Sequence, residues 1–218
     1  WRLMGRIIKL AVPLAFNELI LAISFMILSA ILNTLGVAAS AAVGVGGKIC
    51  GFIMIFTSAF SQSLSAFVAQ NFGAKNFRRA RRAWLSGTGI AMAFGVVMIV
   101  VMSLYGTFFS GLFSSDPDVI RLGAEFTLAY AIDSVFSAAM FCTCGYLNGS
   151  GLANITLIQC IIGVVVRVPA AFILMSVSGG SMFVTGLCIP ISTVSQLIFL
   201  LIYLRANKNK RLLNTDNC

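Results

Sequence analysis

The sequence predicts an all-α membrane protein, a bundle of six transmembrane helices, and three observations lead to this fold class. Hydrophobic residues make up 59% of the 218 residues, charged residues only 10%, and the mean hydropathy is +1.00. Soluble domains carry about 25% charged residues, so this composition excludes an ordinary water-soluble fold. Apolar stretches also recur at the length of roughly 20 residues that a helix needs to cross a bilayer.

Six apolar segments are separated by turn signals or charged runs. Pro13 falls near the beginning of the first, a place where a helix tolerates proline. The run NFGAKNFRRARR ends the second, SSDP follows the third, and glycine-containing breaks follow the fourth and fifth. The predicted helices cover residues 9–35, 38–70, 84–109, 119–148, 154–177 and 182–204. They form one transmembrane lobe, residues 1–205, followed by a basic tail, residues 206–218.

The net charge of +9 is distributed very unevenly along the chain. Twelve of the 15 Lys and Arg residues fall in three groups that six spans would bring to one side of the membrane. These groups are Arg2, Arg6 and Lys9; Lys75, Arg78, Arg79, Arg81 and Arg82; and Arg205, Lys208, Lys210 and Arg211. The positive-inside rule then places both ends of this segment and the arginine-rich loop in the cytoplasm, with the chain in the cell membrane. The partner is the lipid bilayer, and the pattern argues against nucleic acid.

Two acids, Glu18 and Asp133, lie inside predicted membrane helices. An ionised group at the bilayer centre costs roughly 2.5–3.5 kcal/mol or more, so such residues usually face a partner or a water-filled path. Desolvation favours the neutral form of a carboxylate, and a nearby cation favours the charged form. One site can therefore hold either a proton or a cation, which is the minimum chemistry of antiport. The two acids are also the candidate ligands for Na⁺.

Polar residues at helical spacing extend these two sites along their helices. Asn33 continues the face of Glu18, Tyr130 and Ser137 flank Asp133, and Gln62 lies between Ser58 and Ser65 on the second span. Arg167 shares a face with Gln159 and Gly163, and we expect Asp133 to be its partner. The candidate ion- and substrate-binding residues are Glu18, Asn33, Gln62, Tyr130, Asp133, Ser137 and Arg167.

Each charged candidate also has a structural interpretation. Glu18 could be a capping group or a salt bridge to Lys9 near the interface, and Asp133 could serve packing alone. For Arg167, an ion pair that fixes helix packing beside Pro169 is as compatible with the sequence as a functional role. Lys48 would reach the outer interface if the second helix begins near it.

Small residues and cysteines are interpreted as packing residues. Gly87, Ala91 and Gly95 form one small-residue stripe, and Gly145 with Gly149 forms another, as in closely packed membrane helices. The six cysteines have no metal-binding or disulfide spacing. We therefore predict no cofactor and no metal site beyond the coupling ion.

Several motifs in this order resemble those of a known transporter family. They are P-x-x-x-x-E (Pro13, Glu18), LGVAASAAVGVGGKICGF, AQNFGAKNFRRARRA, LFSSDPDVIRLGAEFTLAY with Asp133, and GYLNGSG. From about Arg6 to Arg205 the chain resembles the carboxy-terminal half of a multidrug and toxic compound extrusion (MATE) transporter. The most specific piece is AQNFGAKNFRRARRA, with Gln70, Gly73, Ala74 and Asn76.

The resemblance implies a twelve-helix protein of two lobes, in which the amino-terminal lobe is the partner of this chain. It implies export of bulky, often cationic, organic compounds coupled to inward flow of H⁺ or Na⁺. In one branch of the family the coupling acids are a Glu on the seventh helix and an Asp on the tenth, and Glu18 and Asp133 occupy these positions. Because the chain starts at Trp1 without Met, we expect it to be a piece of a longer protein.

Two other functions are alternatives to export, an intramembrane enzyme and a flippase. An intramembrane enzyme is disfavoured because the chain has no His, no HExxH motif and no paired Asp motif. A flippase for lipids or lipid-linked saccharides belongs to the same superfamily and remains the alternative. Such proteins tend to carry more cationic residues in the cavity, where Arg167 is the one clear candidate.

Overall fold

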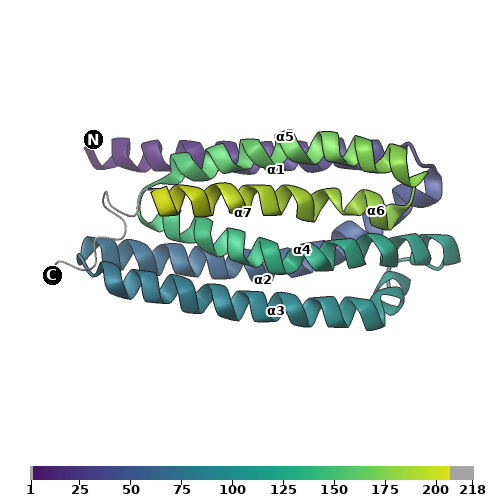
Figure 1. The fold of residues 1–218 in the computed structure, drawn as a ribbon, viewed down its shortest axis with the longest axis horizontal. Helices are drawn as coiled ribbons and strands as arrows, with labels where there is room; N and C mark the ends of the chain where they lie inside the picture. Colours follow the sequence, from purple (N-terminus) through teal and green to yellow (C-terminus); the bar gives the residue numbers. More distant parts are fainter. Residues whose placement is uncertain (1, 207–218) are drawn as a thin grey trace.

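The fold class predicted from the sequence is confirmed by a computed structural model, which describes residues 2–206, with side chains from residue 11 onward (Figure 1). Within these residues, six membrane spans are long and apolar enough to cross a bilayer. Five are single helices, and the sixth consists of a short and a longer helix. Their bounds are α1 (Arg2–Asn33), α2 (Val37–Gly73), α3 (Phe77–Gly111), α4 (Pro117–Gly149), α5 (Ala153–Ser178), α6 (Met182–Gly186) and α7 (Cys188–Ala206). The predicted basic tail falls outside the described residues.

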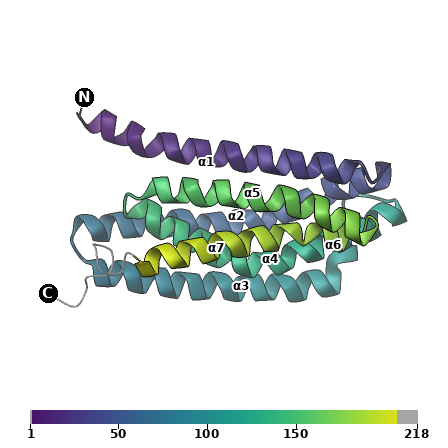
Figure 2. The same ribbon diagram turned by 45° about the horizontal axis from the view of Figure 1, so that its top comes forward.

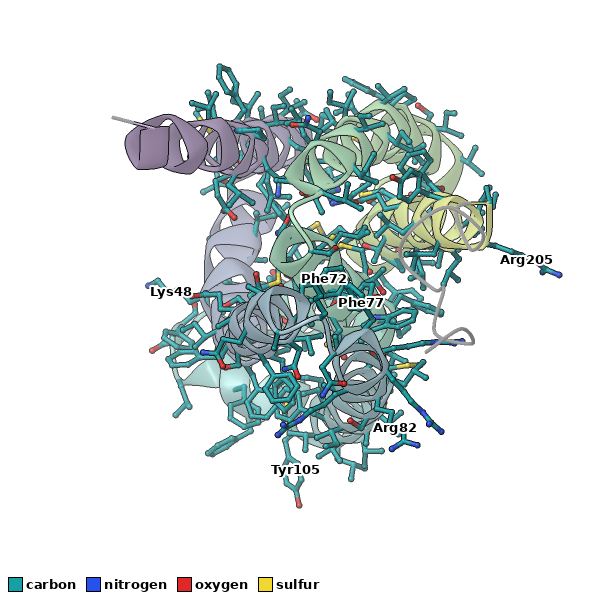
Figure 3. All side chains as sticks on the ribbon, turned by 90° about the vertical axis from the view of Figure 1, so that its left-hand side faces the viewer. Lys48, Phe72, Phe77, Arg82, Tyr105 and Arg205 are labelled. Carbon is teal, nitrogen blue, oxygen red and sulfur yellow. The ribbon has the colours of Figure 1, made fainter. Side chains whose placement is uncertain are left out.

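The spans run alternately up and down, so the beginning of α1, the α2–α3 turn and the end of α7 lie at the same end of the bundle (Figure 1). The three basic groups lie in these segments. Of the third group, only Arg205 is among the described residues. At this end, Arg82 and Arg205 extend away from the helices (Figure 3). The first four helices have 32 to 37 residues. At 1.5 Å per residue they measure about 50 Å, longer than the roughly 30 Å hydrocarbon core of a bilayer.

The arginine-rich run belongs to a helix and not to a loop, which corrects the predicted start of the third span. Helix α3 begins at Phe77 because the Asn76 side chain accepts a hydrogen bond from the backbone N–H of Arg79 at 3.3 Å. Lys75, with φ of 58°, reverses the chain after α2. The turn is therefore only three residues long, Ala74–Asn76. The arginines occupy the first two turns of α3.

Two further differences from the predicted spans lie near prolines: the start of the first span and a break in the sixth. Pro13 lies inside α1, which begins eleven residues earlier, at Arg2. The sixth span breaks at Leu187, between α6 and α7. Pro190 has no N–H to donate to the carbonyl of Gly186 four residues before it, so the regular hydrogen-bond ladder cannot continue there.

Helix α4 is the centre of the bundle and packs most extensively against α2 and α3. Close approach depends on glycine: a Cβ on Gly145 or Gly149 would meet the backbone oxygens of Ser61 or Ser65 in α2. On the other side, a Cβ on Gly95 of α3 would lie 2.9 Å from the backbone oxygen of Ser134. These contacts fix α2 against the last turns of α4 and α3 against its middle.

Helix α1 lies at the edge of the bundle, where it packs against α5 and makes few contacts with α2 (Figure 2). Lys48 of α2 is also at the surface. It lies eleven residues after α2 begins at Val37, close to the predicted start at residue 38, so the condition for Lys48 to mark the start of the helix is not met. Its Nζ lies 5.4 Å from the ring centroid of Phe113, just beyond the end of α3.

Candidate functional site

A cavity of about 620 Å³ lies between α1, α2, α4, α5 and α7. Six of the seven candidate residues line it: Glu18, Gln62, Tyr130, Asp133, Ser137 and Arg167. Asn33 does not, and instead lines a second cavity of about 470 Å³ between α1, α2 and α4. The two cavities share Phe25, Met54 and Tyr130 among their lining residues. Residues from five separate helices thus meet in one space.

Asp133 is the buried acid of this cavity, with 3% of its surface exposed. It is the central residue of α4, sixteen positions from both Pro117 and Gly149. Its Oδ1 has no hydrogen-bond partner among the described residues. The Thr193 hydroxyl interacts with the carboxylate and also lies 3.1 Å from the Ile189 carbonyl oxygen. Because a hydroxyl has one proton, it can serve only one of these acceptors at a time.

Glu18 lines the same cavity but is exposed. It lies sixteen residues from Arg2 and fifteen from Asn33, and is therefore also near the middle of its helix. Its exposure follows from the position of α1 at the edge of the bundle. No described cation lies within salt-bridge distance of it. A salt bridge between Glu18 and Lys9 stays a prediction, because the Lys9 side chain lies outside the described side chains.

Arg167 does not form the predicted ion pair with Asp133. The one salt bridge between described side chains joins Arg121 and Glu125 of α4, at 3.6 Å. Instead, the buried Arg167 guanidinium donates from Nε to Ser192 Oγ at 3.1 Å and from Nη1 to Ser24 Oγ at 3.2 Å. It also lies 4.8 Å from the ring centroid of Phe25. These contacts from α1 and α7 hold the guanidinium, and Asp133 acts on its charge only from beyond salt-bridge distance.

Amide side chains also belong to the site: Gln159 was expected on the face of Arg167, whereas Gln196 was not anticipated from the sequence. Gln159 and Gln196 are both buried, and both line the cavity. The Gln196 amide packs against Gly163, where a Cβ would collide with it. Oδ1 of Asn17 and Oε1 of Gln159 have no hydrogen-bond partner among the described residues. The signal available in the sequence was Gln196 itself, an amide within an otherwise apolar span.

The cavity contains side-chain oxygens without hydrogen-bond partners, the positively charged Arg167 side chain and neutral hydrogen-bond donors. Among the described residues, no three His, Cys, Asp or Glu side chains come together as a metal site. A bound inorganic cation would therefore depend on the two carboxylates together with neutral oxygens such as those of Tyr130 and Thr193. The unfilled Oδ1 of Asp133 fits such a ligand, and it fits a proton equally well.

The sequence profile of the MatE family matches residues 13–173. A Staphylococcus haemolyticus protein named multidrug export protein MepA is 25% identical over 207 residues, which are 94% of this chain and 45% of that protein. A Shewanella oneidensis protein named FAD transporter is 29% identical over 117 residues, 54% of this chain and 26% of that protein. This chain therefore spans less than half the length of either relative.

Solved structures of transporters share the fold. A MOP superfamily transporter from Pyrococcus furiosus, described as having a binding pocket of reverse polarity, superposes with a TM-score of 0.86 at 16% identity. An outward-facing MATE transporter gives 0.85 at the same identity. Each comparison covers 94% of this chain and 45% of the other. The six-helix bundle thus corresponds to about half of such a transporter.

Proposed function

Because this chain belongs to the MatE family of membrane transporters, we propose that it is the carboxy-terminal half of a secondary active exporter in the cell membrane. Its cargo would be small organic compounds, often cationic, and the driving force inward flow of H⁺ or Na⁺. The observation that carries this proposal is the cavity that joins Glu18 and Asp133. It brings two intramembrane acids from separate helices to one space large enough for an organic molecule.

Antiport requires that the driving ion and the cargo exclude each other from a shared site. Asp133 offers an acceptor that is not occupied by any described side chain, so either a proton, Na⁺ or a cationic group can take it. Binding one neutralises the carboxylate and removes the attraction for the other. Exposed Glu18 extends the same negative site toward the edge of the bundle.

The assignment to the carboxy-terminal half is supported by the positions of the acids and by the α2–α3 turn. Glu18 lies on the first span and Asp133 on the fourth, as in the helices that carry the coupling acids in one branch of the family. The motif AQNFGAKN closes α2 and caps α3. The amino-terminal lobe would then cover the exposed side of α1 and the open cavity.

A transport assay with the protein of the complete reading frame tests this function. In liposomes, we expect ethidium transport to require an imposed proton or Na⁺ gradient and to stop when that gradient is collapsed by an ionophore. A flippase would instead move a fluorescently labelled phospholipid between leaflets. Gradient-independent lipid movement without ethidium transport would reject export and favour the alternative.

The membrane orientation follows from the charge distribution and is tested by cysteine labelling. Arg79, near the start of α3, and Ser115, in the connection after α3, are exposed. The two ends of α3 lie at opposite ends of the bundle (Figure 1), and five native cysteines are buried. In a Cys218→Ser background, we expect an impermeant maleimide to label Ser115→Cys in intact cells, and to label Arg79→Cys only after permeabilisation. Labelling in the reverse pattern would contradict cytoplasmic termini.

A further inference from the structure

Arg167 is a buried cation that forms no salt bridge with any described carboxylate. It has 4% of its surface exposed, lines the 620 Å³ cavity, and lies beyond salt-bridge distance of both Asp133 and Glu18. A guanidinium has five N–H groups. Two donate to Ser192 and Ser24, and the other three have no acceptor among the described residues.

A purely structural role does not explain this arrangement well. A buried charge that only served packing would be expected to contact a group of opposite charge directly, whereas Asp133 acts on Arg167 only from beyond salt-bridge distance. Here two hydroxyls and the ring of Phe25 fix the orientation of the guanidinium but supply no negative charge. The side chain is therefore held in place with donors and charge still available.

An oxyanion is the ligand that completes such a site. Arginine binds carboxylate and phosphate groups through two parallel charge-assisted hydrogen bonds, and a desolvated site strengthens them. The same cavity holds Asp133 and Glu18, which attract a cationic group, and Phe25, Phe141 and Tyr130, which can contact an aromatic body. Sites for both signs of charge thus lie within one space.

We propose that Arg167 binds a carboxylate or phosphate group of the transported compound, in a subsite separate from the two acids. This inference rests on the proposed function in one respect, because it takes the cavity between α1, α2, α4, α5 and α7 as the place where cargo binds. It adds a subsite that recognises the opposite end of the cargo.

Equilibrium binding to the complete protein in phosphate-free detergent tests the subsite directly. Rhodamine B carries a free carboxylate that its ethyl ester lacks, and flavin mononucleotide carries a phosphate that riboflavin lacks. The wild-type protein should bind rhodamine B more tightly than its ethyl ester, or flavin mononucleotide more tightly than riboflavin, or both. The carboxylate pair and the phosphate pair show which oxyanion is accepted. Tighter binding of the analogue in both pairs would overturn the proposal without any variant.

Arginine variants then assign the preference to this side chain. In Arg167→Gln, the preference for the anionic member should fall by about tenfold or more, the effect of losing hydrogen bonds between charged groups. Arg167→Lys should keep part of it, since the charge remains but the planar fork is lost. Arg121→Gln, which removes an exposed arginine from α4, is the matched control and should leave the preference unchanged. An unchanged preference in Arg167→Gln would overturn the proposal.

Two further outcomes separate this inference from its alternatives. Added phosphatidylglycerol should leave the preference intact; complete displacement by it would identify a lipid headgroup as the occupant and overturn a cargo subsite. Because binding needs no gradient, an Arg167-dependent preference without coupled transport would reject the proposed antiport alone. Coupled transport without such a preference would reject the anion subsite alone.

Discussion

Replacing Asp133 by Asn is expected to reduce ion-coupled efflux to the level of vesicles without protein, while the protein still folds. Asparagine has nearly the same size and keeps a hydrogen-bonding side chain, but it cannot exchange a proton or carry the charge that attracts a cation. No described ion pair is lost, because Arg167 is held by Ser24 and Ser192. The variant therefore removes the acid–base function with little change in packing.

The measurement is efflux of a fluorescent cation, normalised to the amount of folded protein, from the complete protein in liposomes. Glu125→Gln is the matched control, since Glu125 is a half-buried acid on the same helix, lies outside the cavity and pairs with Arg121. We expect it to transport at the wild-type rate. Efflux from Asp133→Asn at the wild-type rate would remove the coupling site from this half and assign it to the other lobe.

The two cavity acids are expected to differ in importance because they differ in burial. Both lie near the middle of their helices, so position along the helix does not separate them. Asp133 is buried on the central helix α4, whereas Glu18 is exposed on α1 at the edge of the bundle. Glu18→Gln should therefore impair efflux to a similar or somewhat smaller degree.

Expressed without its partner lobe, this chain is expected to insert into membranes but not to transport. Glu18 and Gln62 line the cavity and are exposed on the isolated bundle. Lipid cannot satisfy such polar groups, so they require the other lobe or a second copy of the chain. Gradient-driven transport should be at background for the chain alone and present for the complete protein at matched reconstitution levels.

Crosslinking distinguishes the two ways in which the isolated chain could be active. Robust transport by a species that crosslinks only as a monomer would contradict the requirement for a second lobe. Transport by a crosslinked dimer would show that a second copy of this chain can replace the amino-terminal half, as the parallel repeats of such transporters allow. An inactive chain that nevertheless inserts and resists extraction fulfils the prediction.

The sequence by itself determined the fold class and the main elements of the cavity. Composition and span length are properties of the chain alone, and a bilayer restricts such a chain to helices. Helical periodicity also placed Tyr130 and Ser137 on the face of Asp133, and Gln159 and Gly163 on that of Arg167. The structure positions all of these but Gly163 as lining residues of one cavity.

The tertiary structure alone decided which side chains meet and which are enclosed. Arg167 lies beside Ser24 and Ser192, and not within salt-bridge distance of Asp133. Periodicity fixes the face that a residue occupies but not the distance between two helices. That distance depends on packing across the bundle, where Gly145 and Gly149 bring α2 and α4 together and α1 remains at the edge. The burial of Asp133 and the exposure of Glu18 follow from this packing.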